Sequence, residues 1–360
     1  PLSPMKIITD IRTKLYAETM NYDKTDDLVG GLISEEELWS CTTCGACMEE
    51  CPVLIEHVPT IVDMRRHLVL SEGKPPAQAN ESLEKTKQSG NPWGFPQEDR
   101  LKWAESTDFK PPTLKDKNEV DILYWVGCAG SYDPRNQNIA SNMLKILESA
   151  NIDYAVLGKE ETCTGDSARR LGEEYLFETL AKQNIKTMNK YKFNKIVASC
   201  PHCMNTILHE YPDFGGNYEV VHHTELIDEL LATGKIQPIT KTDKKITFHD
   251  PCYLGRHNKV FDEPRNILKN VAEVENIIEM KESRESSMCC GAGGGNMWHE
   301  INKGSRVNVE RFKQAIDTGA ETVATGCSFC TIMMDDAMKV TGKEDVMEVK
   351  DIAEIVGDSI

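Results

Sequence analysis

The sequence predicts an α+β protein of several domains, in which a helical segment comes first and two similar α/β domains follow. The first observation is a repeat of cysteines, since four of them recur at offsets of 124, 126, 127 and 127 residues. A nearly constant offset over such a length is typical of duplicated domains. Second, short apolar stretches alternate with helical stretches in both copies, which favours parallel α/β layers. Third, residues 1–72 show helical spacing instead.

The segment 1–72 is predicted to be helical and to carry a run of cysteines. Ser34 is placed as an N-cap with Glu37 at the third helical position, which is the arrangement of a capping box. The short helix that follows leads to Cys41. Residues 60–70 have apolar side chains at helical spacing and basic ones near the end, which favours a second helix.

Residues 73–118 are predicted to form a Pro-rich linker that wraps over the surface, because prolines interrupt this part of the chain repeatedly. Trp93, Phe95 and Trp103 indicate that the linker is pinned against the rest of the protein. All 13 cysteines of the chain lie outside it.

The two α/β domains are predicted at 119–240 and 241–360. Strands are expected over 121–126 and 245–248, and each leads into a cysteine. Helices are expected over 138–150, 167–191 and 304–318. Cysteines just beyond the strands of a parallel sheet lie where such sheets bind ligands.

The charge balance excludes one class of partner. Asp and Glu number 58 against 41 Lys and Arg, a net charge of -17. Such a surface repels nucleic acid, which needs cations to replace its counterions. It favours a partner with a basic docking patch. No run of 18 apolar residues and no signal peptide occurs in the sequence.

A disulfide framework is the first alternative for so many cysteines. Disulfide-dense chains are typically small and secreted, whereas this one has 360 residues and an odd number of cysteines, 13. Metal-bound thiolates in a reducing cytoplasm explain the composition better. The cysteines fall into three sets without remainder, and the spacing within each set predicts iron–sulfur ligands.

The first set is a ferredoxin-like C-x2-C-x2-C-x3-C-P run. It comprises Cys41, Cys44, Cys47 and Cys51, followed by Pro52. Gly45 lets backbone N–H groups approach the cluster, and Pro52 turns the chain away. In two-cluster ferredoxins the fourth cysteine of such a run serves the other cluster. Either Cys51 closes its own cluster, or its partners lie in sequence before Pro1, and we favour the second hypothesis.

The third set has one sulfur more than a four-iron cubane needs. It comprises Cys252, Cys289, Cys290, Cys327 and Cys330. The excess fits a cluster opened into a non-cubane shape. A glycine-rich stretch follows, in which Gly291, Gly293 and Gly294 let the backbone crowd the metal and donate N–H to sulfur. A phosphate-binding loop is the alternative, but the glycine pattern breaks at Asn296 and no strand precedes it.

The second set lacks the doubled cysteine. It comprises Cys128, Cys163, Cys200 and Cys203, and Thr164 follows Cys163 directly. Four thiolates hold a cubane or a tetrahedral zinc, and the set is equally a decayed site kept for packing.

Several polar residues near the cysteines are candidates for a supporting role. His202 and His249 are proton donors beside a cluster, residues that orient its ligands, or ordinary core histidines. His222 and His223 are expected to be structural. Arg169 and Arg170 are candidates for holding an anionic cofactor, although a charged helix surface is the commoner meaning.

The third set resembles the CCG domain, because 36 residues separate Cys252 from Cys289 and also Cys290 from Cys327. Two copies behind a ferredoxin segment resemble heterodisulfide reductase catalytic subunits and the iron–sulfur subunit of glycolate oxidase. The nearest resemblance is to the membrane-bound electron-transfer-flavoprotein:quinone oxidoreductases of bacterial fatty-acid oxidation. The stretches that carry it are 2–4, 39–52, 91–94, 124–130, 163–166, 217–225 and 289–298.

The resemblance implies a membrane domain with b-type haem, a two-cluster ferredoxin segment and two CCG domains. This chain is then expected to be the soluble arm at the cytoplasmic face of the membrane, beginning between the two ferredoxin runs. The resemblance also implies 4Fe-4S cubane clusters at the ferredoxin segment and a non-cubane 4Fe-4S cluster in the second CCG domain. Cys-Thr-Gly at 163–165 leaves open whether the first CCG domain binds a further metal.

We therefore expect an oxidoreductase that conducts electrons and has no catalytic residue beyond its metal ligands. Electrons from a reduced flavoprotein, such as electron-transfer flavoprotein, enter at the third set. They leave through the first set toward quinone in a haem-bearing membrane part. The alternatives are a heterodisulfide-reductase-like thiol/disulfide reductase, the iron–sulfur subunit of a 2-hydroxy-acid oxidase (glycolate or lactate), and a zinc-stapled scaffold.

Overall fold

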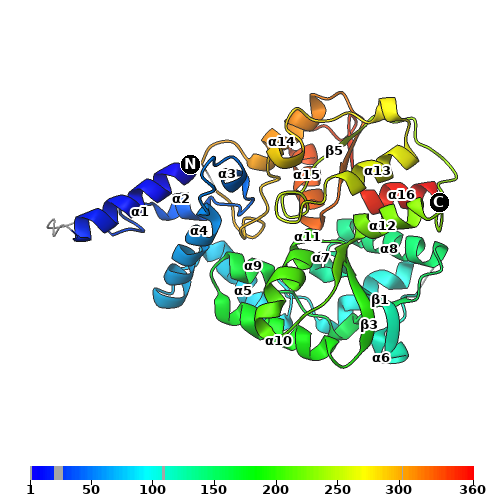
Figure 1. Ribbon diagram of the computed structural model, residues 1–360, viewed down its shortest axis with the longest axis horizontal. Helices are drawn as coiled ribbons and strands as arrows, with labels where there is room; N and C mark the ends of the chain where they lie inside the picture. Colours follow the sequence, from blue (N-terminus) through cyan, green and yellow to red (C-terminus); the bar gives the residue numbers. More distant parts are fainter. Residues whose placement is uncertain (1, 20–26, 108–109, 302) are drawn as a thin grey trace.

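The computed structural model describes residues 2–19, 27–107, 110–301 and 303–360. Helix α1 (Pro4–Thr19) projects from one end of the molecule, and the two α/β domains form the body at the other end (Figure 1). The ferredoxin-like run lies between them, around α3 (Ala46–Glu49). In the described part of the chain, no helix is both long and apolar enough to cross a membrane.

The first α/β domain contains a sheet of parallel strands. Their order is β2 (Tyr154–Ala155), β1 (Glu119–Trp125), β3 (Lys192–Ala198) and β4 (Val220–His222). The helices of this domain include α7 (Gly127–Tyr132), α8 (Pro134–Ser149), α9 (Asp166–Arg170), α10 (Glu174–Met188), α11 (Pro201–Asn205) and α12 (His223–Ala232). Parallel strands separated by helices confirm the predicted α/β layers.

The second α/β domain repeats this arrangement with a smaller parallel sheet. Its strands are β5 (Ile246–Phe248), β6 (Thr322–Thr325) and β7 (Glu348–Asp351), in that order. Its helices are α13 (Asp262–Val271), α14 (Val307–Ile316), α15 (Ser328–Val340) and α16 (Ile352–Ser359). The fold is therefore α+β with two related α/β domains, as the sequence predicted.

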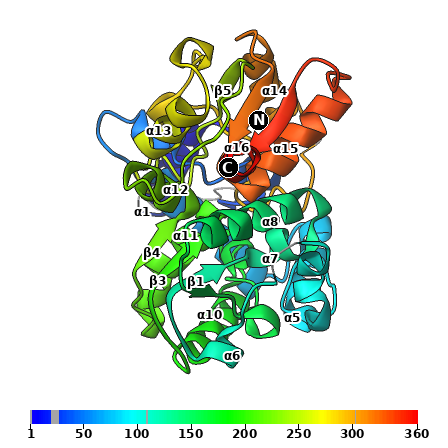
Figure 2. The same cartoon turned by 90° about the vertical axis from the view of Figure 1, so that its right-hand side faces the viewer.

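One of the hydrophobic core clusters spans both α/β domains. Figure 2 shows α8, α12 and α16 at the junction between them. Met143 of α8, Ile227 of α12 and Val356 of α16 are all fully buried in the same cluster. Gly357 permits the close approach of α16 to α8, since a Cβ there would lie 2.0 Å from Asn142 Oδ1. The orientation of one domain on the other is therefore fixed by core packing.

The amino-terminal segment folds into helices, and the predicted capping box lies at the start of α2. Its elements after α1 are α2 (Glu35–Trp39), α3, α4 (His57–Arg66) and a π-helical turn at His67–Ser71. Ser34 Oγ accepts a hydrogen bond from the N–H of Glu37 at 3.1 Å, and Glu37 Oε2 accepts one from the N–H of Ser34 at 3.3 Å. The capping box is therefore confirmed.

We expect Ser34→Ala to lower the free energy of unfolding by about 1 kcal/mol, because a helix N-terminal N–H loses its acceptor. The measurement is urea unfolding followed by circular dichroism. Thr13→Ala serves as the control, since the exposed Thr13 hydroxyl only donates to Thr9 O within α1. Equal stability of the two variants would show that the capping box contributes nothing.

The segment 73–118 differs from the linker that its prolines predicted. It contains α5 (Ala77–Ser89), a 3-10 helix at Gln97–Ser106 and α6 (Leu114–Lys117). The prolines bracket these helices rather than prevent them, because proline is tolerated at a helix start. The expected pinning is present for all three aromatic residues. Trp103 is buried, Trp93 packs edge-on against Trp298, and Phe95, although 46% exposed, packs against Tyr132 with 5.7 Å between the ring centroids.

The helix expected over 167–191 is two helices in the structure. Gly172, at φ +87°, separates α9 from α10. A Cβ at Gly172 would lie 2.6 Å from the carbonyl carbon of Arg65, so the break lets α4 approach this corner closely. The helical periodicity of the sequence continues across the break, which is why the pattern did not predict it.

Candidate iron–sulfur centres

The carboxyl ends of both sheets deliver cysteines, as expected for parallel α/β domains. Cys128 follows β1 and Cys200 follows β3 in the first domain, while Cys252 follows β5 and Cys327 follows β6 in the second. The second thiol of each C-x2-C pair, Cys203 or Cys330, then lies within the first turn of α11 or α15.

The third set gathers its sulfurs in the interior of the second domain. Cys290 Sγ lies 3.3 Å from Cys330 Sγ. Cys289 interacts with both Cys252 and Cys290. Every member except Cys289 is buried. The adjacent pair Cys289-Cys290 therefore points both sulfurs into one centre.

The backbone of Gly291 donates a hydrogen bond to a thiol of the third set. Its N–H lies 3.2 Å from Cys289 Sγ and donates to that sulfur. Its φ of +96° belongs to the left-handed region, which other residues rarely adopt. The glycine-rich stretch that follows forms no strand or helix among its described residues, so it is a loop.

Gly293 and Gly294 allow a close approach between the loops that carry the first and third sets. A Cβ at Gly293 would lie 2.2 Å from the carbonyl oxygen of Thr42, and one at Gly294 would lie 2.2 Å from that of Cys41. These glycines let the loop of the second domain pack directly on the backbone of the first set. On the other side of that run, Gly45 faces His257, with 3.3 Å from its ideal Cβ position to Nε2.

The first set therefore adjoins the third. Cys44 lies close enough to Cys289 for the two thiols to interact, and this interaction, together with burial, raises the pKa of Cys44. Cys41 and Cys47 lie close enough to Cys44 for their charges to interact. Sequence spacing could not predict this contact, because more than 200 residues separate the two sets.

Cys51 has a different environment from the other three members of its run. Its Sγ accepts a hydrogen bond from the N–H of Ile55 at 3.4 Å, and backbone N–H groups of residues 53–55 lower its pKa. The chain turns at Pro52 and Val53, as predicted for the proline. Val53 and Leu54 beside it are 73% and 76% exposed. The thiolate of Cys51 is thus stabilised at an exposed apolar surface.

The second set surrounds a small cavity between the two α/β domains. The cavity has a volume of about 30 Å³ and is lined by all four thiols, by Trp93 and by Phe329 of α15. Thr164 Oγ1 lies 3.8 Å from Cys203 Sγ, just as Cys290 in the other copy lies against Cys330. Thr164 therefore occupies the place of the missing fifth sulfur. The second set also touches the third, since Cys200 interacts with Cys327.

Arg100 is a buried cation at the second set that the sequence pattern did not reveal. Its guanidinium donates to Cys128 Sγ at 3.5 Å and to Glu161 Oε1 at 2.5 Å. Hydrogen bonding from Cys163 and then the charge of Arg100 lower the pKa of Cys128. Glu161 in turn accepts from the N–H of Gly127 at 2.9 Å. Arg100 comes from the 73–118 segment, so only folding brings it to the sulfur.

Three stacked rings lie among the ligand sets. His202 stacks on Tyr253 at 4.0 Å between ring centroids, and Tyr253 stacks on His257 at 4.2 Å. Tyr253 Oη lies 2.9 Å from Thr43 Oγ1, and His202 Nδ1 lies 3.0 Å from Asp166. His202 is therefore a buried residue with a hydrogen-bond partner, and it lies next to the cysteines of the second set. Tyr253 and His257 were missed by the sequence analysis, although both lie within five residues of Cys252.

The remaining histidines and arginines that the sequence singled out have protein partners. His223 Nε2 lies 2.8 Å from Asp351 Oδ1 and its Nδ1 lies 3.2 Å from His222 Nε2, so this pair bridges the two domains. Arg170 pairs with Asp166 and Glu210. Arg169 likewise pairs with Glu210. Both arginines that were candidates for binding an anionic cofactor therefore form ion pairs with carboxylates of the protein.

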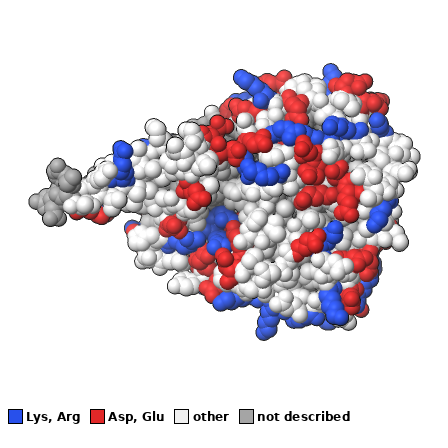
Figure 3. All heavy atoms as spheres, in the orientation of Figure 1, with Lys and Arg blue, Asp and Glu red and all other residues white. Residues whose placement is uncertain are grey.

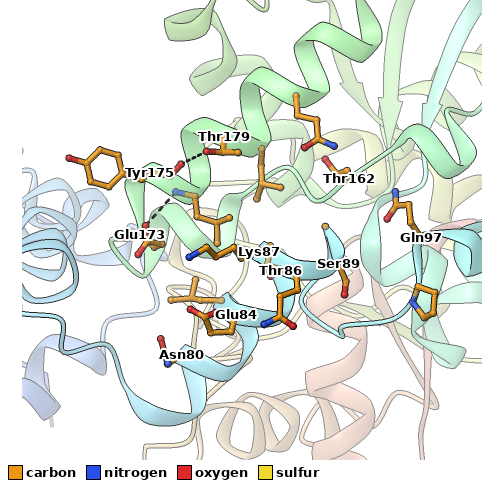
Figure 4. Close-up of a pocket in the computed structure, with 17 residues that line it drawn as sticks. Asn80, Glu84, Thr86, Lys87, Ser89, Gln97, Thr162, Glu173, Tyr175 and Thr179 are labelled. Atoms are coloured by element: carbon orange, nitrogen blue, oxygen red, sulfur yellow. Dashed lines mark hydrogen bonds between the residues drawn. The ribbon is translucent and has the colours of Figure 1, made fainter.

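A larger groove lies away from the thiols. It has a volume of about 630 Å³ and runs between α5 and α10, lined by polar side chains such as Glu84, Lys87 and Glu173 (Figure 4). No cysteine lines it, although Thr162 at its edge precedes Cys163. The groove therefore gives no direct access to the thiols.

The arrangement fits iron–sulfur clusters on three observations. Sulfurs of distant segments converge, as Cys290 and Cys330 do. Backbone N–H groups point at cysteine sulfurs, at Thr43 toward Cys41, at Gly165 toward Cys163 and at Gly291 toward Cys289. A ring nitrogen of the buried His249 and the sulfurs of Cys290 and Cys330 lie within 4.8 Å of one another. Two parallel α/β domains with thiols at facing edges, behind a ferredoxin-like run, define a class of cysteine-rich iron–sulfur proteins.

Comparison with known proteins gives the same class. The cysteine-rich domain model, CCG, matches residues 122–208 and 246–335. The chain is 44% identical to the "Probable iron-sulfur-binding oxidoreductase FadF" of Bacillus subtilis, over 94% of this chain and 48% of that protein. It is 40% identical to the EtfAB:quinone oxidoreductase of Syntrophomonas wolfei, over 91% of this chain and 47% of that one.

A third relative matches over most of its own length. It is a subunit of the dihydromethanophenazine:CoB–CoM heterodisulfide reductase of Methanosarcina barkeri, 31% identical over 91% of this chain and 78% of that one. The chain belongs to the family of CCG-domain iron–sulfur proteins. It spans about half the length of the first two relatives. The crystal structure of Francisella tularensis glutamate racemase matches at a TM-score of only 0.32 and 13% identity, over 67% of this chain and 79% of that one, too low to define a shared fold.

Proposed function

We propose that this chain conducts electrons from a reduced flavoprotein, such as electron-transfer flavoprotein, toward membrane quinone. The observation that carries the proposal is the contact between Cys44 and Cys289, because it places the ligands of two centres side by side. Cys200 and Cys327 make a second such contact. Iron–sulfur clusters bound by these thiols supply one-electron chemistry, and the protein sets their potentials through hydrogen bonds and burial.

The three cysteine sets are proposed to bind different metal centres. The five thiols of the third set are proposed to hold a non-cubane 4Fe-4S cluster, and Cys41, Cys44 and Cys47 are proposed to hold part of a 4Fe-4S cubane. Cys51 is proposed to serve a second cubane with cysteines outside this chain, since its sulfur is governed by backbone N–H groups at an exposed apolar surface. The second set is proposed to bind a further metal through four thiols around one cavity.

The surface charge supports docking of a flavoprotein with a basic patch. Acidic side chains gather on the face where α12 and α13 lie (Figure 3). The acidic residues of these two helices that are not buried include Glu225, Asp228, Glu229, Asp262 and Glu263. The charge of Glu263 raises the pKa of Glu225 after the effect of burial, so these carboxylates lie close together.

A thiol/disulfide reductase is the second candidate, favoured by the 31% identity to the heterodisulfide reductase of Methanosarcina barkeri. Disulfide cleavage at the third set would need access for the substrate. Four of its five thiols, Cys252, Cys290, Cys327 and Cys330, are at most 6% exposed, which supports conduction. Membrane attachment and a role in fatty-acid oxidation belong to the same proposal and rest on the resemblance.

Anaerobic iron and sulfide analysis with EPR tests the proposal. We expect about eight to twelve irons per chain, that is two or three four-iron clusters. Cys290→Ala should abolish the signal of the unusual cluster and slow reduction by reduced electron-transfer flavoprotein at least about tenfold, or 1.4 kcal/mol in barrier. Cys51→Ala is the matched control and should keep that signal. A colourless protein, or disulfide turnover without electron uptake from a flavoprotein, would contradict the proposal.

A further inference from the structure

His249 lies between a buried arginine and the sulfurs of the third set. Its Nδ1 lies 2.9 Å from Arg311 Nε, and its side chain is only 1% exposed. Its ring nitrogen and the sulfurs of Cys290 and Cys330 lie within 4.8 Å of one another. Among the described residues, Nε2 has no hydrogen-bond partner.

The arginine determines which nitrogen of His249 carries a proton. A guanidinium has donors but no acceptor, so Arg311 donates its Nε–H to the lone pair of Nδ1. Nδ1 then bears no hydrogen, and the neutral ring carries its proton on Nε2. A protonated Nε2 has no lone pair for a metal. Nε2, the ring nitrogen that Arg311 does not engage, is therefore a donor and not a ligand.

Arg311 is itself held rigidly, so the tautomer is fixed by the fold. Its other N–H groups donate to Glu282 O at 2.8 Å, to Gln314 Oε1 at 2.6 Å and to Ser287 Oγ at 3.1 Å. The side chain is fully buried in α14. Because these partners fix the orientation of Arg311, its hydrogen bond to His249 costs little additional entropy.

The first domain provides a comparison at the same position. Trp125 precedes Cys128 by three residues, as His249 precedes Cys252. Its indole Nε1 is also buried without a partner among the described residues. Indole nitrogen donates and does not bind metal. Both copies thus place an N–H donor, rather than a ligand, just before the strand-end cysteine.

We propose that His249 offers its Nε2–H, which no group among the described residues accepts, to a sulfur of the cluster at the third set and thereby raises the reduction potential of that centre. The inference rests on the proposed function, since it requires a cluster at this set. An N–H donor stabilises the extra negative charge that arrives with an electron, which makes the reduced state more favourable. His249 acts as a positioning and tuning residue, and Arg311 acts through it.

The test is an EPR-monitored redox titration of the anaerobic holoprotein. His249→Leu removes the donor, and we expect the reduced-to-oxidised ratio to fall about tenfold at a given potential, a shift of about 59 mV to lower potential for one electron. His249→Gln keeps an N–H at the place of Nε2 and should remain near the original potential. His223→Leu is the matched control, because His223 is equally buried but pairs with Asp351.

A second measurement on the unaltered holoprotein keeps the inference testable if His249→Leu does not fold. ENDOR spectroscopy after exchange into D2O should reveal an exchangeable proton and a weak nitrogen coupling that His249→Gln modifies. A strong nitrogen coupling typical of ligation would overturn the inference, as would an unshifted potential in His249→Leu with full iron content. Iron analysis separates these outcomes from failure of the proposed function, because that failure would leave no cluster signal in any variant.

Discussion

Arg65→Met is expected to lower the free energy of unfolding by about 4 kcal/mol, because several buried carbonyls lose their donor at about 1–3 kcal/mol each. Part of that cost is returned, since a charge no longer has to be buried. The Arg65 guanidinium donates to Leu38 O at 2.7 Å, to Cys41 O at 2.7 Å, to Arg170 O at 3.0 Å and to Gly294 O at 2.8 Å.

The position of these carbonyls explains why the expected loss of stability is large. Arg65 is fully buried and packs over Trp39, with its guanidinium carbon 5.0 Å from the ring centroid. One side chain thus joins the first set to both α/β domains. We expect the variant to lose iron from the first set as well as stability, because Cys41 O belongs to the ligand loop. Urea unfolding and iron analysis measure the two effects.

Arg66→Met is the matched control, one residue along the same helix. Arg66 pairs with Asp63 and Glu174 at a half-exposed position, where an ion pair contributes about 0–1 kcal/mol. If both variants unfold at the same urea concentration, the buried network of Arg65 does not hold the domains together.

Gly294→Ala is the second change with a large expected effect, about 3 kcal/mol of lost stability. The added Cβ would lie 2.2 Å from Cys41 O, and the residue has a φ of +67°. Overpacking against backbone costs about 1–3 kcal/mol, and a left-handed conformation adds about 1–2 kcal/mol for a residue with a Cβ. The loop must therefore move away from the first set. This movement is expected to disrupt the contact between Cys44 and Cys289.

Gly304→Ala is the control that separates the cost of backbone strain from the cost of overpacking. Gly304 has a φ of +79°, yet nothing lies within 4 Å of an added Cβ. This variant should lose only about 1 kcal/mol, from backbone strain alone. Thermal unfolding and the EPR signals of both variants are the measurements. A Gly294→Ala protein with unaltered interaction between its EPR signals would mean that the packing of this loop does not determine the distance between centres.

The sequence predicted much of the fold because its signals were local or repeated. The capping box of Ser34 and Glu37 depends on residues three apart, and the structure contains it. The strands that precede Cys128 and Cys252 were found from short apolar runs. The helix α5 was missed, because prolines on either side of it suggested a linker. The break at Gly172 was missed because the reason for it, the approach of Arg65, lies more than 100 residues away.

The sequence by itself determined that two copies of one α/β domain are present, and it predicted which cysteines belong together. It could do so because ligand loops and strand ends have fixed spacings that survive in the chain as a pattern. Only the tertiary structure decided that the three sets touch, that Arg65 and Arg100 are buried cations beside them, and that His249 lies next to Cys290 and Cys330. These features arise where segments distant in sequence pack against each other, and their geometry is set by the shared core rather than by any local pattern.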